Sequence, residues 1–497
     1  MKAFPFTRGA GGAFGPPAGG RAQPCRARRG LGPLLSALLL ALASCSPDTA
    51  GTTQAPGDPH DVPVPADFMG MVHAGVSSAD PALIAGEYDR LDRLGTVWIL
   101  RDFTWSAIQE EAKKDAPAGD WNWAAFDGYV KNGNSRNKKI LGLLDYDAPW
   151  IHGSKTGSQT VIENALGQTV QADQYADSHL ERIVAGAEEI ERFCAYAEAA
   201  VSRYDGAHGY GRVDAWCIWN EPNLYPRFWT GTRDEFYALT KAAAAAIRRA
   251  NPQAVIIAGA LNTLADEAWV RGFFTSGAME GVDAFAYHPY TPNPSGTAAT
   301  YQKVRDILGD YGFANKVWIT EVGYPTQGSY GTEVAESRMP NTVVKTITLL
   351  AAEGAQRVFW YHLYDPENPD PADSEDWFGL FAPKSNGSWE KKGGADAYAL
   401  CARHLSGKTL RSQGLGGLAV PDKVQSYYFE GDDGRRCLIL WNDSAVSPRT
   451  LNLTIPGKNP LLHDPANGSQ RAINAADSYT LYPRDSMEEN LLFITWE

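Results

Sequence analysis

Short apolar runs alternate with longer amphipathic stretches from about residue 63 to residue 405. Runs rich in β-branched and aromatic residues predict eight strands, at residues 68–72, 96–101, 139–144, 213–221, 254–258, 282–287, 316–321 and 357–361. Helical stretches separate them, including 81–94, 187–204 and one opened by the capping box Thr232-Arg-Asp-Glu235. This alternation predicts parallel strands in a closed (β/α)8 barrel over residues 63–407. A doubly wound open sheet is the alternative, but no Gly-rich phosphate loop supports it.

The pattern changes after a last predicted helix at 395–405. Strand-like runs at 425–429, 436–441, 451–455 and 491–495 are separated by turn signals such as Asp433-Gly434. They predict a small antiparallel β-sandwich over residues 408–497. Residues 151–179 are polar and aperiodic, and they follow the third strand. We expect this segment to lie on the catalytic face of the barrel as a wall or lid.

The N-terminus has the features of an export signal. Basic residues precede an apolar stretch at 31–43, which is short for a membrane span and has signal-peptide proportions. It ends in Leu42-Ala-Ser-Cys45, which resembles a bacterial lipobox whose cysteine is lipidated. We therefore expect residues 1–45 to be a signal peptide, residues 46–62 to be a flexible tether, and the protein to be anchored at the cell envelope. Cleavage after Ala43, which would release the protein, and twin-arginine export through Arg28-Arg29 are the alternatives.

Composition narrows the possible ligands. The chain has 497 residues, 45 basic and 58 acidic. Six of the basic residues and none of the acidic ones lie in the first 45 positions, so the remainder is strongly acidic. We do not expect a protein with so negative a net charge to bind nucleic acid, which is also negatively charged. The four cysteines beyond Cys45 are scattered, and histidines show no metal-ligand spacing, so we predict no metal and no cofactor.

Two of the predicted strands end in a glutamate. Glu221 closes the fourth run and Glu321 closes the seventh, and Pro222 and Gly323 break the pattern directly after them. Catalytic residues of (β/α)8 barrels lie at the C-terminal strand ends. A pair of carboxyl groups there suggests glycoside hydrolysis by an acid/base and a nucleophile. We assign these roles to Glu221 and Glu321, and we expect Arg101, at the end of the second strand, to help keep Glu321 ionised.

These motifs resemble the clan A glycoside hydrolases, and most closely family 39, which includes β-xylosidases and exopolysaccharide glycosidases. The matching residues are Trp219-Asn-Glu-Pro-Asn-Leu224, Trp318-Ile-Thr-Glu-Val-Gly-Tyr324, Arg101-Asp-Phe-Thr-Trp105, His288-Pro-Tyr290 and Trp360. The resemblance implies the same roles for the two glutamates. It also implies that Asn220 holds the sugar 2-hydroxyl and that Tyr290 contacts the nucleophile.

Several further residues are candidates for substrate binding. His288 is either part of the site or a core histidine. Trp150 and Trp229, with Tyr225 and Trp377, are candidate sugar platforms, although a tryptophan is more often a core residue. The segments 151–179 and 366–375 depart from the family pattern.

We interpret the chain as an exported retaining glycosidase for a β-linked polysaccharide or oligosaccharide, with no protein partner predicted. A carbohydrate-binding lipoprotein on an inactive barrel and a transglycosylase are the alternatives.

Overall fold

The computed structural model describes residues 61–148, 150–151, 161–163, 169–171, 186–224, 228–229, 231–385, 388–484 and 490–497. The predicted signal segment with Cys45, most of the tether and Tyr225 lie outside these residues. Residues 59–497 form one compact unit. Within the described part of the chain, no helix has the length and apolar character needed to cross a membrane.

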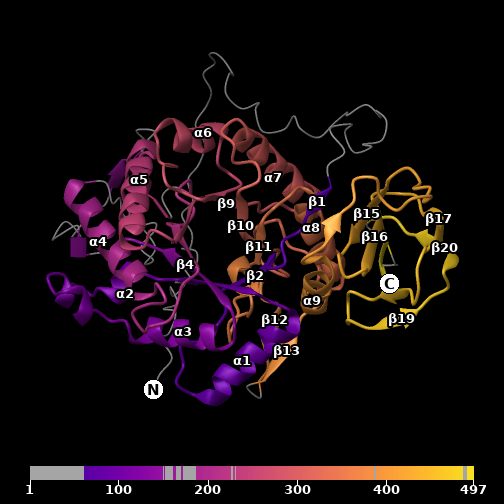
Figure 1. Cartoon of the computed structure of the whole chain (residues 1–497), viewed down its shortest axis with the longest axis horizontal. Coiled ribbons are helices and arrows are strands. Elements are labelled where there is room, and N and C mark those ends of the chain that lie inside the picture. Colours follow the sequence, from indigo (N-terminus) through magenta and orange to yellow (C-terminus); the bar gives the residue numbers. More distant parts are fainter. Residues whose placement is uncertain are drawn as a thin grey trace, which may run out of the picture. The chain divides into compact units, whose positions relative to one another are not determined.

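Eight parallel strands close into a barrel, and each corresponds to one of the predicted apolar runs (Figure 1). In chain order they are β2 (Met69–Val72), β3 (Trp98–Asp102), β4 (Lys139–Leu144), β7 (Ala215–Ile218), β8 (Val255–Asn262), β9 (Ala284–His288), β10 (Val317–Val322) and β11 (Arg357–Trp360). The register of β11 with β2 closes the ring. The predicted (β/α)8 fold is therefore confirmed.

Helices surround this barrel (Figure 1). They are α1 (Pro81–Leu94), α2 (Trp105–Ile108), α3 (Ala124–Ser135), α4 (Ala187–Arg203), α5 (Arg233–Ala250), α6 (Glu267–Thr275), α7 (Pro294–Gly309), α8 (Met339–Ala352) and α9 (Gly394–Leu405). The capping box predicted at the start of α5 is present, with the Thr232 N–H donating to Glu235 Oε2 at 2.7 Å. Two short 3₁₀ turns, η2 (Ala118–Asp120) and η6 (Ser374–Trp377), lie in connecting segments.

Side chains alternate along each barrel strand between two apolar layers. In β3, for example, Trp98 and Leu100 fill the barrel interior, whereas Ile99 packs in the layer beneath the helices. In β11, Phe359 faces the interior and Trp360 the helix layer. The side chain that a strand end directs into the barrel mouth therefore depends on this two-residue period.

Antiparallel strands form the C-terminal region, as predicted. One sheet has seven strands, in the order β1 (Val62–Pro63), β14 (Thr409–Leu410), β15 (Val424–Glu430), β16 (Arg436–Asn442), β21 (Leu491–Trp496), β18 (Leu461–His463) and β19 (Gln470–Ala472). A two-stranded sheet of β17 (Arg449–Thr454) and β20 (Ala476–Leu481) contributes Leu451 and Leu453 to a core shared with Leu438. The sequence did not reveal that β1, which precedes the barrel, joins this sheet.

The opposite face of the seven-stranded sheet packs on the barrel. Phe429, Ile439 and Phe493 belong to the same apolar cluster as residues of α8 and α9. Two small hairpins complete the described structure, β5 (Val161–Glu163) with β6 (Thr169–Gln171) and β12 (Phe381–Pro383) with β13 (Trp389–Lys391). The four cysteines of the described residues are buried free thiols.

Candidate active site

Backbone geometry at the end of β7 sets the position of Glu221. Trp219 and Glu221 both adopt positive φ values, of 62° and 41°, which non-glycine residues rarely do. The Trp219 N–H donates to the Leu144 carbonyl at 2.9 Å, and the Glu221 N–H donates to the Ala260 carbonyl at 2.9 Å. These bonds to the two flanking strands hold a conformation that is unfavourable on its own.

A bulge in β8 supplies the second of these bonds. The pairing of β8 with β9 shifts between Ala258 and Leu261, and Gly259 has φ 106°. A Cβ at this glycine would lie 2.8 Å from the Ala286 carbonyl oxygen, so both the backbone angle and the space require glycine. The bulge turns the Ala260 carbonyl toward Glu221, in keeping with the frequent placement of bulges beside active sites.

One oxygen of Glu221 is held by two neighbours. Asn262 Nδ2 donates to Glu221 Oε1 at 2.9 Å, and His288 Nδ1 lies 2.9 Å from the same oxygen. The side chain is buried, with 7% of its surface exposed. Oε2 has no hydrogen-bond partner among the described residues, so it is the oxygen that remains for a ligand.

Glu321 is held in the same way. The Tyr290 hydroxyl donates to Glu321 Oε2 at 2.9 Å, and His288 Nδ1 lies 3.6 Å from that oxygen. Burial and the nearby Glu321 raise the pKa of Tyr290 well above its usual value, so the hydroxyl keeps its proton and donates. The expected contact of Tyr290 with Glu321 is thus present in the structure.

The two carboxyl groups and His288 form one compact cluster. Glu221, His288 and Glu321 each have one ligand atom within 4.8 Å of the others. This spacing would also suit a metal ion, but each side chain already has a hydrogen-bond partner in the protein. His288 therefore belongs to the site.

Electrostatics couples the protonation of these groups. Burial raises the pKa of Glu321 to about 7; His288 opposes this shift and the Glu221 carboxylate adds to it. Burial disfavours the charged form of His288, but the Glu321 and Glu221 carboxylates outweigh it and raise the pKa of the imidazole. The repulsion between two carboxylates this close therefore favours the protonated form of Glu321.

Asn220 presents an unsatisfied acceptor beside the pair. Its Nδ2 donates to the Tyr146 hydroxyl at 3.0 Å, while its Oδ1 is buried and has no hydrogen-bond partner among the described residues. A buried acceptor without a partner is costly, and a bound hydroxyl group would satisfy it.

Two of the predicted residues lie away from Glu221 and Glu321. Arg101 does not form an ion pair with Glu321; its guanidinium lies 5.8 Å over the ring of Tyr129 in α3. Tyr129 belongs to the apolar layer beneath the helices, so Arg101 lies on the helix side of β3. The contacts expected of it are made by Tyr290 and His288 instead. Trp360 lies on the helix side of β11 and is 1% exposed, so it presents no ring face to a ligand.

The other predicted platforms are mainly packing residues. Trp229 is 1% exposed and packs edge-on against Trp219. Trp150 is half-buried; its Nε1 donates to the Gln109 carbonyl at 2.9 Å and its ring contacts Trp105. Trp377 is also half-buried, and its Nε1 donates to the Asp370 carbonyl at 2.7 Å.

Sequence reasoning missed several residues around the pair. Tyr361, at the end of β11, points to the barrel interior and contacts the ring of Tyr290 edge-on at 6.3 Å. Its hydroxyl donates to Glu375 Oε2 at 3.1 Å, so the segment at 366–375 does contribute a side chain near the site. Asn262 and Tyr146 were missed as well. The strand-end rule that found Glu221 would have found Asn262 if the β8 run had been continued through Gly259.

Comparison with known proteins is consistent with this geometry. The family model "Glycosyl hydrolases family 39" matches residues 166–367, a range that includes both glutamates. The resemblance predicted from the sequence is confirmed. The protein is a glycosidase. No curated protein sequence matches the chain.

Solved structures share the fold of this glycosidase at low sequence identity. A family 39 glycoside hydrolase from Bacteroides cellulosilyticus WH2 has 18% identity and a TM-score of 0.62, with 87% of this chain and 81% of that chain covered. A family 39 β-xylosidase from Caulobacter crescentus has 15% identity and a TM-score of 0.58, with 88% and 97% covered. The catalytic domain of xylanase C, a family 30 enzyme from Talaromyces cellulolyticus, has 13% identity and a TM-score of 0.58, with 88% and 97% covered.

Proposed function

We propose that this glycosidase cleaves β-linked glycans with retention of anomeric configuration. The observation that carries the proposal is the separation of the two glutamates, whose nearest grouped atoms lie within 4.8 Å. Retaining enzymes hold their carboxyl groups about 5 Å apart, whereas inverting enzymes leave about 6.5–9.5 Å for a water molecule. The short separation supports direct attack by one carboxylate on the sugar.

In the first step, Glu321 attacks the anomeric carbon while Glu221 protonates the departing oxygen. Glu321 Oε2 accepts the Tyr290 hydrogen bond, which leaves Oε1 to form the bond to carbon. Glu221 Oε1 is occupied by Asn262 and His288, which leaves Oε2 to carry the proton. This step requires a proton on Glu221, which passes to the departing oxygen as its bond to the anomeric carbon breaks.

In the second step, Glu221 acts as a base. It removes a proton from a water molecule, which attacks the anomeric carbon and releases Glu321. Asn220 Oδ1 is available to accept a hydrogen bond from the sugar 2-hydroxyl throughout. Hydrogen bonds to this hydroxyl strengthen in the transition state of retaining enzymes and so favour the reaction.

The configuration of the first-formed product tests this proposal. The purified protein is screened with nitrophenyl β-glycosides and soluble polysaccharides, and the product of the best substrate is followed by proton NMR from the first minutes. We expect the β-anomer first, with the α-anomer appearing only through mutarotation. An α-anomer formed first would contradict retention. Glycan binding without turnover would indicate a binding protein, and products longer than the substrate would indicate a transglycosylase.

We also propose that the enzyme is exported and anchored through Cys45, which follows a signal-like stretch. One lipid chain alone binds membranes weakly, so the anchor requires the multiple acylation typical of such lipoproteins. Cys45→Ser is expected to move the protein from the membrane fraction to the soluble fraction. Fractionation unchanged by the substitution would favour release after Ala43.

A further inference from the structure

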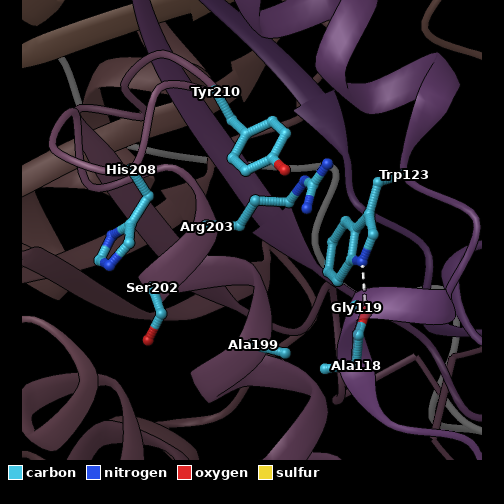
Figure 2. A pocket seen from close by; sticks show the side chains of 8 residues that line it. All are labelled: Ala118, Gly119, Trp123, Ala199, Ser202, Arg203, His208 and Tyr210. Carbon is cyan, nitrogen blue, oxygen red and sulfur yellow. Dashed lines mark hydrogen bonds between the residues drawn. The ribbon is translucent and has the colours of Figure 1, made fainter.

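A hollow of about 230 Å³ lies on the flank of the barrel, away from the two glutamates. The start of α3, the end of α4 and the loop at 205–212 line it, with Trp123, Ala199, Ser202, Arg203, His208 and Tyr210 contributing side chains (Figure 2). The loop at 205–212 leads into the N-terminal end of β7, whereas Glu221 lies beyond its C-terminal end. The hollow is therefore not part of the catalytic site.

Stacked side chains form a fixed surface in this hollow. The guanidinium of Arg203 lies 3.4 Å over the ring of Tyr210 and 5.2 Å over the ring of Trp123, and Figure 2 shows it between the two. Asp127 binds Arg203 through two hydrogen bonds, of 2.8 and 2.7 Å, so the positive charge is already balanced. Such a surface requires little ordering when a ligand binds.

The loop that carries Tyr210 is also fixed. A β-bridge joins Asp205 to Arg212 at its base, and Asp205 accepts hydrogen bonds from the backbone of Ala207 and His208. Yet Tyr210 remains 42% exposed, which is unusual for a large aromatic residue in this protein. An exposed ring on a fixed loop is available to a ligand without rearrangement.

The chemistry of the hollow fits a sugar ring. Its surface is mostly apolar and aromatic, while the Ser202 hydroxyl and the His208 imidazole lie at its edge (Figure 2). A pyranose has an apolar face that packs on such side chains and hydroxyl groups that bond to a polar edge. The volume is below the range of about 300–1,000 Å³ for drug-sized ligands, so a single ring is the appropriate size. The balanced charge of Arg203 and the acidic chain argue against an anionic ligand.

We propose that this hollow is a second glycan-binding site, which holds one sugar unit of a neutral polysaccharide outside the catalytic site. The site would keep the enzyme on a polymer between cleavage events. The choice of ligand relies on the glycosidase identity, but the proposal does not depend on the roles assigned to Glu221 and Glu321.

Affinity electrophoresis of the full-length protein tests the proposal. All proteins carry Glu321→Gln, so that the polymer in the gel stays intact, and the gels contain either soluble xylan or a soluble neutral β-glucan. Tyr210→Ala removes the exposed ring. Ser202→Trp keeps that ring and fills the hollow with a larger side chain. Tyr482→Ala is the matched control, because this tyrosine is 38% exposed in the C-terminal region. A thermal melt verifies that each variant is folded.

We expect at least one polymer to retard the parent and the Tyr482→Ala protein. Tyr210→Ala and Ser202→Trp should each weaken this binding about two- to tenfold, the range of one aromatic contact. Equal retardation of all four proteins, or no retardation of the parent by either polymer, would overturn the proposal. With Glu321 intact, Tyr210→Ala should hydrolyse a nitrophenyl glycoside as fast as the parent. If no glycoside is hydrolysed but retardation still depends on Tyr210, the proposed function fails and this site stands.

Discussion

At the scale of single residues, Glu221 and Glu321 each have one oxygen held by neighbouring side chains. Tyr290 is the neutral donor to Glu321, and His288 lies between the two carboxyl groups. The sequence identified both glutamates because each closes an apolar strand and is followed by a residue that ends it. It did not identify their partners correctly in every case, because whether a strand-end side chain faces the barrel or the helices depends on register, as Arg101 and Trp360 show.

Tyr290→Phe tests the role of the neutral donor. The substitution removes one hydrogen bond to the nucleophile and leaves the ring in place. A hydrogen bond to a charged group contributes about 1.5–3 kcal/mol, so kcat should fall about ten- to a hundredfold. KM should change much less, as measured with a nitrophenyl glycoside.

Tyr364→Phe is the control for this experiment, because the Tyr364 hydroxyl bonds to Arg90 and Glu87 and does not donate to Glu221 or Glu321. It should retain the parent kcat. An equal loss in both variants would mean that Tyr290 has only a structural role.

At the scale of elements, the apolar runs were sufficient to locate all eight barrel strands. The sequence did not show that β8 continues past Gly259, because a glycine inside an apolar run indicates either a strand end or a bulge. The short strands β18 and β19 and the exposed strand β20 lack a strong apolar pattern, and they were missed. Contacts between elements that are distant in sequence were also hidden, as at the junction of α9 with β18.

Two imidazoles meet at this junction. His404 of α9 and His463 of β18 have ring centroids 5.0 Å apart. Burial lowers the pKa of His404 to about 3, and the nearby His463 adds to this shift. Burial also lowers the pKa of His463, to about 4. Both pKa values lie below 6.5, the pKa of a histidine in the unfolded chain. In acid, the unfolded chain therefore binds more protons than the folded protein. The stability of the fold should therefore be complete above pH 6.5 and should decrease as the pH falls toward 4.

His404→Phe should weaken this pH dependence, because it removes one of the groups that take up a proton on unfolding. The measurement is the thermal midpoint at pH 7.5 and at pH 5. The variant should show a smaller decrease between these pH values than the parent. The exposed Tyr482 provides the control, and Tyr482→Phe should show the same decrease as the parent. A decrease unchanged by His404→Phe would show that this histidine is protonated in the folded state.

At the scale of the whole molecule, the barrel and the C-terminal sheet share one apolar core. Phe493 of β21 is fully buried in the same cluster as Leu405 of α9 and Leu350 of α8. If either the barrel or the C-terminal sheet unfolds, the other loses the apolar contacts that it makes with it. We therefore expect a single cooperative unfolding transition for residues 59–497.

Phe493→Ala examines this coupling. Truncation of a buried phenylalanine costs about 3–5 kcal/mol, so the calorimetric midpoint should fall by several degrees. The temperature at which glycosidase activity is lost should fall with it, although the substitution lies outside the barrel. Two separate transitions, with activity lost at the parent temperature, would show that the barrel unfolds independently.

The central claim is that Glu321 is the nucleophile and Glu221 the acid/base of a retaining enzyme. The most direct measurement is the configuration of the product formed when azide rescues each alanine variant on a β-glycoside with a good leaving group. In Glu221→Ala, the glycosyl-enzyme still forms, and azide should displace it to give the β-glycosyl azide. In Glu321→Ala, azide should enter the vacated space and give the α-glycosyl azide. An α-product from Glu221→Ala, or the same product from both variants, would contradict the account.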